Sequence, residues 1–235
     1  MQLFYNKNIN STTEQFTFDK TESRHIVRVL RKKEEDKILI TNGLGELFTS
    51  EIIIANDKRC LVKITNIEAK PKSWNYYLHI AIAPTKLNDR FEWFLEKATE
   101  IGIDEITPII CDHSERKVLK LDRMEKIVHS AAKQSLKFNF PKLNEPITFK
   151  EFLNLNQNGQ LFIAHCEETD KKSLKSQLKP SLNTTILIGP EGDFSTKEIE
   201  QSLKHKFIAV SLGESRLRTE TAGVVAAHSV AFVNE

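Results

Sequence analysis

The chain of 235 residues is poor in the patterns that disulfide frameworks and metal centres require. Its three cysteines, Cys60, Cys111 and Cys166, are odd in number, far apart and without a C-x-x-C pair. This excludes a disulfide framework and a zinc site of the usual spacing. The seven histidines include no i, i+4 pair and no ligand-like cluster, so we predict no metal. The cysteine usage fits a reducing cytoplasm.

Long hydrophobic runs and an excess of one charge are also missing. No stretch of about 18 apolar residues occurs, and the start MQLFYNKNIN has no basic segment followed by an apolar one. We therefore expect a cytoplasmic protein that is neither exported nor inserted into a membrane. The net charge of +2 does not by itself indicate a nucleic-acid partner. With 40% hydrophobic residues, the chain can bury one large core, or a large and a small one.

Two patterns divide the chain near the polar, proline-broken segment 69–73. Before this segment, β-branched runs and one hairpin-type turn at 42–45 predict a small β-barrel, with strands at 36–41, 47–54 and 59–67. After it, apolar strands alternate with helical segments, which predicts a mainly parallel α/β sheet, with strands near 77–83, 105–111, 160–165, 184–189 and 207–212. We predict one domain over 1–70 and a second over 75–235.

Helix boundaries are indicated by caps and by glycine. An apolar stripe over 89–101 ends at Gly102, which predicts a helix that stops there. Capping-box spacing predicts three further helix starts, at Asp122 with Glu125, at Thr148 with Glu151 and at Ser195 with Glu198.

Two basic surfaces are predicted. A helix beginning near Thr21 directs Ile26, Val29 and Leu30 inward and places Arg24, Arg28 and Arg31 on another face, where they form a patch suited to phosphate or simply a solvated face. In the lysine- and arginine-rich stretch 113–142, one helix face is apolar, with Met124, Ile127, Val128 and Ala131. The opposite face carries Arg123, Lys126, Lys133 and Lys137. A polyanion can lie along that face, with salt-sensitive affinity.

Two successive strand ends carry unusual loops. The strand 186–188 runs into Gly-Pro-Glu-Gly-Asp-Phe at 189–194, and the strand ending at 211–212 runs into Gly-Glu-Ser-Arg-Leu-Arg-Thr-Glu-Thr-Ala at 213–222. Together they define a crevice at the carboxyl edge of the sheet, where open α/β folds bind ligands. Neither loop is a Rossmann glycine fingerprint or a P-loop, so another class of site is needed.

These loops carry a family resemblance. IGPEG at 188–192 followed by Leu212-Gly213 and LRTETA at 217–222 is similar to the signature of the SPOUT methyltransferases, and specifically of the RsmE family, which methylates N3 of a uridine in 16S ribosomal RNA. The resemblance extends over nearly the whole chain, through His25 to Arg31, Lys86, 97–100 with Gly102, Pro108, 114–116 and 131–135. Asp193 stands where the family usually has a second glycine, and Lys133 where it has glutamate.

The resemblance implies a fold, a cofactor and partners. We expect a PUA-like N-terminal barrel and a C-terminal SPOUT domain threaded into a trefoil knot, a topology that no local pattern could indicate. S-adenosyl-L-methionine is the implied cofactor, and 16S rRNA or the small ribosomal subunit is the implied partner of a homodimer. The dimer interface is expected to include the last helix, from Gly223 to Val233.

The resemblance also implies site residues. The cofactor is expected at Ala164, His165, Ile188, Gly189, Pro190, Glu191, Gly192, Leu212, Gly213, Leu217, Arg218, Thr219, Thr221 and Ala222. RNA is expected at Arg24, His25, Arg28, Arg31, Lys86, Arg90, Arg116, Lys133 and Lys137. Arg218 is the candidate for stabilising negative charge on uracil, and Glu220 for accepting the N3 proton or orienting groups. Alternatively, Glu220 caps the last helix and Arg218 pairs with it.

Two other functions compete with this one. A related SPOUT enzyme acting on another RNA base or on a ribose hydroxyl group would have the same loops. A non-enzymatic rRNA-binding assembly factor would explain the basic faces but would leave both glycine-containing loops without a purpose.

Overall fold

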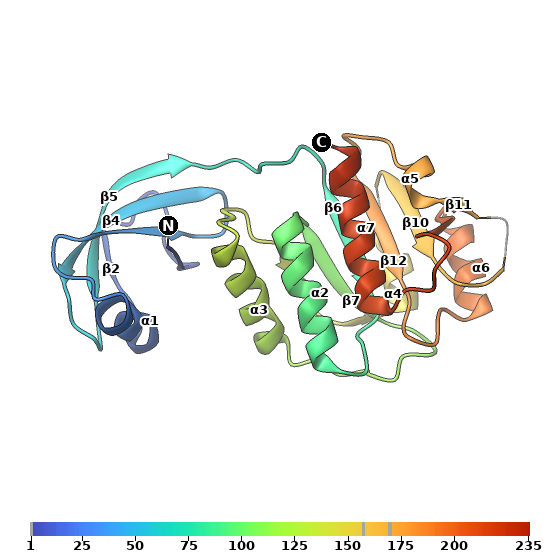
Figure 1. Ribbon diagram of the computed structural model, residues 1–235, viewed down its shortest axis with the longest axis horizontal. Coiled ribbons are helices and arrows are strands. Elements are labelled where there is room, and N and C mark those ends of the chain that lie inside the picture. The colour runs from blue at the N-terminus through green and yellow to red at the C-terminus, as the bar shows by residue number, and fades with distance from the viewer. Residues whose placement is uncertain (1, 157, 169–170) are drawn as a thin grey trace. The chain divides into compact units, whose positions relative to one another are not determined.

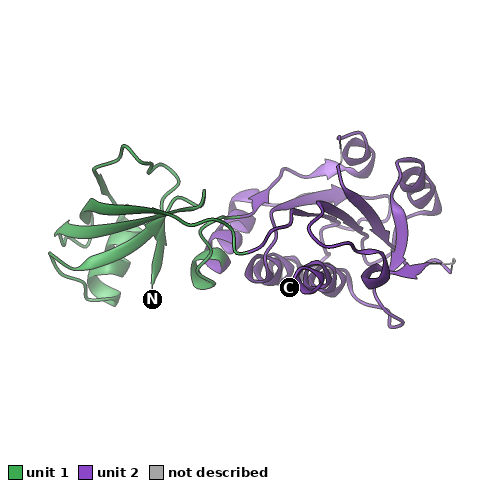
Figure 2. Ribbon diagram, turned by 90° about the horizontal axis from the view of Figure 1, so that it is seen from above, with its two compact units in different colours: residues 1–73, 132–140 green, residues 74–131, 141–235 purple. Residues whose placement is uncertain are grey.

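The computed structural model describes residues 2–156, 158–168 and 171–235, and the chain divides into two compact units (Figure 2). The first unit comprises Met1–Ser73 and Ala132–Phe140, and the second comprises Trp74–Ala131 and Pro141–Glu235. In the described part of the chain, no helix is long and apolar enough to cross a membrane.

The first unit is built on a mixed five-stranded sheet in the order β1-β3-β4-β5-β2. Its pairs are antiparallel except β1 with β3, and breaks of register in the pairing of β4 with β5 bend the sheet around a core that includes Phe4, Ile40 and Phe48. The predicted strands are confirmed to within two residues, and β1 and β2 are additional. The strands are β1 (Leu3–Tyr5), β2 (Gln15–Thr17), β3 (Lys37–Thr41), β4 (Glu46–Ile54) and β5 (Leu61–Ala69).

The helical segment of this unit differs from the prediction. α1 (Lys20–Arg24) continues directly into a π-helical turn, η1 (His25–Val29), in which the Leu30 N–H donates to the His25 carbonyl oxygen. Because a π-turn holds more residues per turn, it rotates the following residues away from the predicted face. Val29 is therefore 68% exposed rather than inward, and Arg31 lies beyond the helix with a φ of 53°. The prediction of one helical face carrying all three arginines was wrong.

The turn between β3 and β4 binds residues that are distant in sequence. Gly43 and Gly45 have positive φ angles of 77° and 87°, which glycine adopts without strain. The Gly45 N–H donates to the Phe138 carbonyl oxygen at 2.8 Å, and the Phe140 N–H donates to the Gly43 carbonyl oxygen at 2.9 Å. Phe140 also stacks on Tyr5, with ring centroids 4.7 Å apart. The predicted hairpin turn is thus also the attachment point of segment 132–140.

The second unit is an α/β domain with a parallel sheet in the order β11-β13-β10-β12-β6-β7-β8, in which β9 also pairs with β7 (Figure 1). The five predicted strands are confirmed, and β8, β9 and β11 are additional two-residue strands. The strands are β6 (Leu78–Ile82), β7 (Glu105–Ile110), β8 (Lys142–Leu143), β9 (Ile147–Thr148), β10 (Gln160–Ala164), β11 (Lys172–Ser173), β12 (Thr184–Ile188) and β13 (Ile208–Ser211).

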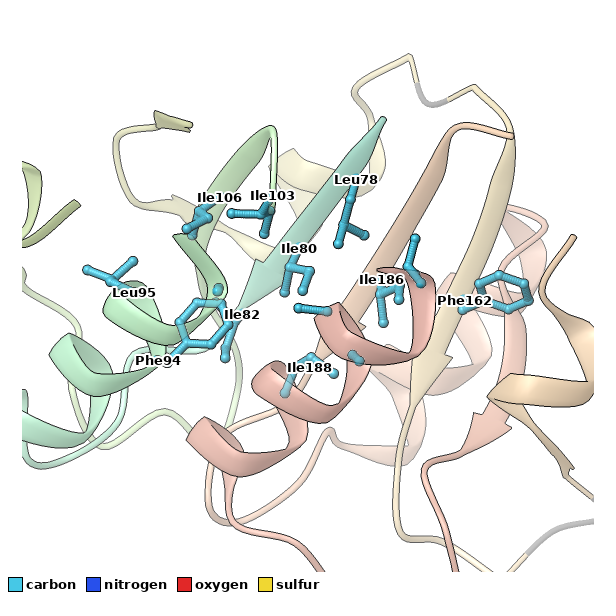
Figure 3. Packing of buried hydrophobic residues seen from close by; sticks show 14 of the residues in the cluster. Leu78, Ile80, Ile82, Phe94, Leu95, Ile103, Ile106, Phe162, Ile186 and Ile188 are labelled. Atoms are coloured by element: carbon cyan, nitrogen blue, oxygen red, sulfur yellow. The ribbon is translucent and has the colours of Figure 1, made fainter. Parts of the chain in front are cut away.

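Helices cover both faces of this sheet. One core contains the buried sides of α2, α3, α5 and α7, and the other contains those of α4 and α6. Along β6, Leu78, Ile80 and Ile82 enter the first core (Figure 3), whereas Ala81 enters the second, because successive side chains of a strand point to opposite faces. The helices are α2 (Asn88–Ile101), α3 (Leu121–Gln134), α4 (Phe149–Leu153), α5 (Leu174–Gln177), α6 (Thr196–Lys204) and α7 (Thr219–Val233).

Most of the predicted helix boundaries are confirmed. α2 ends at Gly102, which has a φ of 125°. Thr148 and Ser195 form complete capping boxes at the starts of α4 and α6. The predicted box at Asp122 was wrong, because α3 already begins at Leu121 and Asp122 lies in its first turn. Lys137 lies beyond the end of α3, so it does not continue the helical face of Arg123, Lys126 and Lys133.

Candidate active site

The site lies where neighbouring parallel strands end. β13, β10, β12 and β6 are adjacent in the sheet and run in the same direction, so their carboxyl ends meet along one edge. Three segments leave this edge side by side: residues 164–168 after β10, 189–195 after β12 and 212–218 after β13.

The loop after β12 is compact. Gly189 and Pro190 are buried, and the Asp193 N–H donates to the Pro190 carbonyl oxygen at 2.9 Å, closing a tight turn. A Cβ atom at position 189 would lie only 3.0 Å from the ring of Phe194, which is itself buried in the core. Close packing against Phe194, rather than a positive φ angle, therefore disfavours a side chain at position 189.

Asp193 links two of the loops. One carboxylate oxygen accepts a hydrogen bond from the Cys166 N–H at 2.7 Å, and the other accepts one from its own neighbour Phe194 at 2.9 Å. Its φ is 65°, in the left-handed region that glycine occupies freely and aspartate tolerates better than most residues. Asp193 thus combines a glycine-like backbone conformation with a side-chain bond between the loops.

Two adjoining cavities open between these loops. The smaller, of about 260 Å³, is lined by Ala164, Cys166, Ile188, Gly189, Pro190, Glu191, Asp193, Arg216, Leu217, Arg218, Thr219 and Ala222. The larger, of about 380 Å³, is lined by Ala164, His165, Cys166, Lys171, Val210, Ser211, Leu212, Gly213, Glu214, Ser215, Arg216, Leu217 and Ala222. They share Ala164, Cys166, Arg216, Leu217 and Ala222, so they form one continuous cleft.

The structure brings the predicted cofactor residues together, except for two. Gly192 and Thr221 line neither cavity. The Gly192 carbonyl oxygen instead accepts a hydrogen bond from Nδ1 of His113 at 3.1 Å, and Thr221 lies in the first turn of α7. Sequence reasoning missed several other lining residues. Lys171 and Arg216 carry no motif signal, and adjacency to the predicted His165 was the only available indication for Cys166.

Two residues that line this cleft have a buried polar atom without a hydrogen-bond partner in the described part of the chain, Nε2 of His165 and Oε2 of Glu191. Oε2 of Glu220, in the first turn of α7, is likewise unmatched, although Glu220 lines neither cavity. Glu191 uses its other oxygen to accept from the Lys86 N–H at 2.9 Å. Buried polar groups are normally satisfied, so the unmatched atoms of two cleft-lining residues are consistent with a site that is completed by a ligand.

The two catalytic candidates have different surroundings. Glu220 is 6% exposed, and its Oε1 lies 3.8 Å from Nε of Arg90. Arg218 occupies the N-cap position of α7 without a side-chain capping bond, and it lines the smaller cavity. Across the described residues no ion pair joins Arg218 to Glu220, so the alternative in which Arg218 simply neutralises Glu220 is not what the structure contains.

Several predicted RNA-binding cations already have partners within their own unit. Arg28 forms an ion pair with Asp57, with Nε 2.8 Å from Oδ2, and Lys133 pairs with Glu22 at 3.1 Å. Gln2 contacts the ring of His25 at 3.2 Å. In the first unit, Arg24 and Arg31 are the predicted arginines for which the described residues provide no side-chain partner.

The predicted cations of the second unit surround the cleft-lining loops. Arg116 donates to the carbonyl oxygens of Thr85 and Lys86, and Lys86 pairs with Glu115 at 2.8 Å. Arg90 faces Glu220. These side chains therefore support the segment next to Glu191 as much as they offer positive charge to a ligand.

The fold and the cleft define a protein of the RNA methyltransferase class. Residues 72–231 match the RNA methyltransferase domain family, and residues 18–65 match the RNA methyltransferase PUA domain family. A Ribosomal RNA small subunit methyltransferase E from Buchnera aphidicola is 34% identical over 221 residues, which cover 90% of this chain and 86% of that protein. The chain belongs to this methyltransferase E family, RsmE.

Solved structures agree with this assignment. A probable rRNA-methyltransferase from Porphyromonas gingivalis has a TM-score of 0.92 and 40% identity, covering 100% of this chain and 98% of that chain. A Ribosomal RNA small subunit methyltransferase E from Neisseria gonorrhoeae, bound to S-adenosyl methionine, has a TM-score of 0.85 and 26% identity, with coverage of 100% and 98%.

Proposed function

We propose that this protein binds S-adenosylmethionine in the two adjoining cavities and methylates N3 of a uridine in 16S ribosomal RNA. Membership of the family supports the activity, and the Neisseria gonorrhoeae relative is bound to the same cofactor. The single observation in the chain that carries the proposal is the cleft itself, where three loops enclose unmatched polar atoms of His165 and Glu191.

The chemistry of the lining fits the two halves of the cofactor. The larger cavity is bordered by apolar side chains such as Val210, Leu212 and Leu217, which suit a flat adenosine group. The smaller cavity has Glu191, Asp193, Arg216 and Arg218 on its walls, and these charges suit the zwitterionic methionine half and the sulfonium. We infer that the adenosine occupies the larger cavity and that the reacting end faces Arg218.

The cofactor supplies the methyl group when it is bound, and the protein has to align that group with the uracil nitrogen. The loop at 189–193 is held by the close packing of Gly189 against Phe194 and by the bond of Asp193 to Cys166, which favours a fixed approach. N3 must lose its proton as the bond to carbon forms, and negative charge then spreads onto O2 and O4. Arg218 is placed on the cavity wall to stabilise that charge.

Two carboxylates are candidates for accepting the N3 proton. Glu220 is the candidate of the sequence, with Arg90 beside one oxygen and the other oxygen unmatched. Glu191 lines the cavity directly, and it also has one unmatched oxygen. Glu220 is buried and lines neither cavity. We propose that one of the two carboxylates accepts the proton from N3 and that the other orients groups around the reacting end.

We propose a homodimer formed through α7. This helix is apolar over most of its surface, with Val224 and Val225 only partly buried and Phe232 55% exposed. A helix that is apolar on all sides is normally covered on all sides. Sedimentation at micromolar concentration should give twice the mass of the 27.0 kDa chain, and a species of single mass would contradict the dimer. We further propose that the C-terminal domain is threaded into the trefoil knot that the resemblance implies.

The decisive experiment uses small ribosomal subunits from a strain that lacks the gene. These are incubated with the purified protein and labelled S-adenosylmethionine in the presence of a chelator, and the methylated nucleoside is identified by mass spectrometry. We expect 3-methyluridine. A methylated guanine, a methylated ribose or no product would overturn the proposed reaction.

A further inference from the structure

His165, directly after β10, has one ring nitrogen that the described residues leave unused. The side chain is 7% exposed and lines the larger cavity, and its Nε2 is buried without a partner. A buried polar atom without a partner is unfavourable, and such atoms next to a cavity are commonly satisfied by what binds there. The question is whether this nitrogen presents a hydrogen or a lone pair.

The neighbouring lysine answers that question. Nζ of Lys171 lies 3.4 Å from Nδ1 of His165, and it donates to the carbonyl oxygens of His165 at 2.9 Å and of Glu167. An ammonium group has three donors and no acceptor, so these three partners use all of its hydrogens. Nδ1 must then be the acceptor, and a neutral ring with an acceptor at Nδ1 carries its hydrogen on Nε2.

The ring is also held in its neutral form. Burial, and then the positive charge of Lys171, lower the pKa of His165, and they outweigh the opposing effect of Asp193 and Glu167. A neutral ring is what the contact with Lys171 requires, because a protonated imidazole has no acceptor. Geometry and charge therefore agree on one state, in which Nε2 is a donor.

We propose that His165 donates a hydrogen bond from Nε2 to the adenosine half of the cofactor, and that Lys171 is the positioning residue that fixes the required tautomer. This inference rests on the proposed function, and to the cofactor contact that the resemblance implies for His165 it adds the donor role of Nε2 and the part of Lys171. The ring nitrogens of adenine and the ribose oxygens are acceptors, and a donor fixed in the cavity wall selects for one of them. Lys171 fixes the tautomer of His165 and, at the same time, binds the carbonyl oxygens of His165 and Glu167 in the same loop.

The donor role is tested by calorimetry with S-adenosylhomocysteine. His165→Phe removes the donor and should weaken binding about tenfold, whereas His165→Gln keeps an N–H near the position of Nε2 and should stay within about threefold of the natural chain. The natural chain is also titrated with analogues that lack one adenine ring nitrogen or one ribose hydroxyl group. One analogue should bind the natural chain about tenfold more weakly and should bind the Phe variant no worse than S-adenosylhomocysteine does. Unchanged affinity in the Phe variant, or an equal response to every analogue, would overturn the donor role.

The role of Lys171 is tested without any ligand. Two-bond nitrogen-proton correlation spectra of the histidine rings should show His165 with its hydrogen on Nε2. Lys171→Met should give a mixture of tautomers, Lys171→Arg should preserve the natural spectrum, and Lys172→Met, at the adjacent exposed lysine, should change nothing. A natural chain with the hydrogen on Nδ1 would sink the inference. Failure of the natural chain to bind S-adenosylhomocysteine would instead sink the proposed function, and it would leave this spectrum as it is.

Discussion

The backbone N–H of Cys166 donates a hydrogen bond to the carboxylate of Asp193, and the two atoms lie 2.7 Å apart. This bond connects the segment after β10 to the loop after β12, and residues of both line the cleft. Asp193 adopts a φ of 65°, in the region that glycine occupies without strain. Its side chain therefore contributes a fixed loop-to-loop contact that glycine could not make.

Replacing Asp193 by alanine should weaken cofactor binding and destabilise the fold. Alanine loses the hydrogen bonds to Cys166 and Phe194 and is strained at a positive φ, which together cost about 1–3 kcal/mol. Asp193→Gly separates the two effects, because glycine relieves the strain but still lacks the carboxylate. We expect the glycine variant to regain stability in denaturant unfolding yet to bind S-adenosylhomocysteine as weakly as the alanine variant. Equal affinity in all three proteins would show that the contact is irrelevant to binding.

The sheet and the position of the cleft could be predicted because they depend on local patterns. Buried β-branched runs such as 184–188 identify strands without reference to the rest of the chain, and loops that follow parallel strands necessarily gather at one edge. Gly102 and the capping boxes at Thr148 and Ser195 are equally local, and the structure contains them.

The features that could not be predicted depend on contacts between distant segments. The π-turn at His25–Val29 shifts Val29 and Arg31 off the predicted face, although the sequence there has an ordinary helical period. Segment 132–140 belongs to the first unit through its bonds to the turn at Gly43 and Gly45, which no pattern within either segment encodes. Similarly, the contacts of Lys171 with His165 exist only once the loop is folded.

Gly189→Val should greatly reduce cofactor affinity. A Cβ atom there already meets the Phe194 ring at 3.0 Å, and valine adds two methyl groups next to this ring, which is buried in the core. The loop must shift, at a cost of about 1–3 kcal/mol, and we expect affinity to fall at least about tenfold. Gly189→Ala, which adds only the Cβ atom, is the graded comparison and should lose less affinity than Gly189→Val. Normal calorimetric affinity in a folded Gly189→Val protein would remove this loop from the site.

Stability should fall as the solution is acidified, because of a buried network at the amino ends of β6 and β7. Burial lowers the pKa of His79 and outweighs the charge of Glu105, so the unfolded chain binds a proton on this group more readily than the folded protein does. The contribution of neutral His79 to the free energy of unfolding is therefore fully present above about pH 6.5, the ordinary histidine pKa. It decreases as the pH falls toward the lower pKa of the folded state. Burial alone would raise the pKa of Glu105, but hydrogen bonds from Asn144 and Tyr77 and the charges of His79 and Lys142 lower it, so a second loss follows below about pH 4.5.

The first of these losses is assigned by a substitution. In chemical denaturation at pH values from 5 to 8, His79→Gln should be less stable overall but should lose the slope between about pH 6.5 and 5. His205→Gln, at an exposed histidine that follows α6, serves as the control and should keep that slope. An unchanged slope in His79→Gln would assign the acid sensitivity to another group.

Charge on the first unit should set RNA affinity and its dependence on salt. Arg24 and Arg31 have no protein partner among the described residues, whereas Arg28 is engaged by Asp57. Arg24→Gln combined with Arg31→Gln should lower the log-log salt slope by about two, one for each lost phosphate contact, and Arg28→Gln should have a smaller effect. Cofactor affinity should not change. If the double variant binds RNA no worse than Lys179→Gln with Lys204→Gln, two exposed lysines of the second unit, then these arginines are a solvated face.

The residues around the reacting end should separate by the kinetic step they affect. Arg218 is placed to stabilise charge that develops only during transfer, so Arg218→Ala should cut kcat by about 10²–10³ while RNA affinity stays close to normal.

The proton acceptor is identified from the dependence of the methylation rate on pH. Removing it should abolish the fall in rate at acid pH and lower the rate by about 10²–10⁴. Glu220→Gln and Glu191→Gln are compared in the same single-turnover assay. The variant that loses the fall at acid pH identifies the base, and the one that keeps this fall with a smaller loss of rate identifies a group that orients. Should Arg218→Ala weaken RNA binding and kcat/KM equally while kcat stays normal, Arg218 holds the substrate instead of stabilising the charge on uracil, because its contribution would then already be present before the methyl group moves.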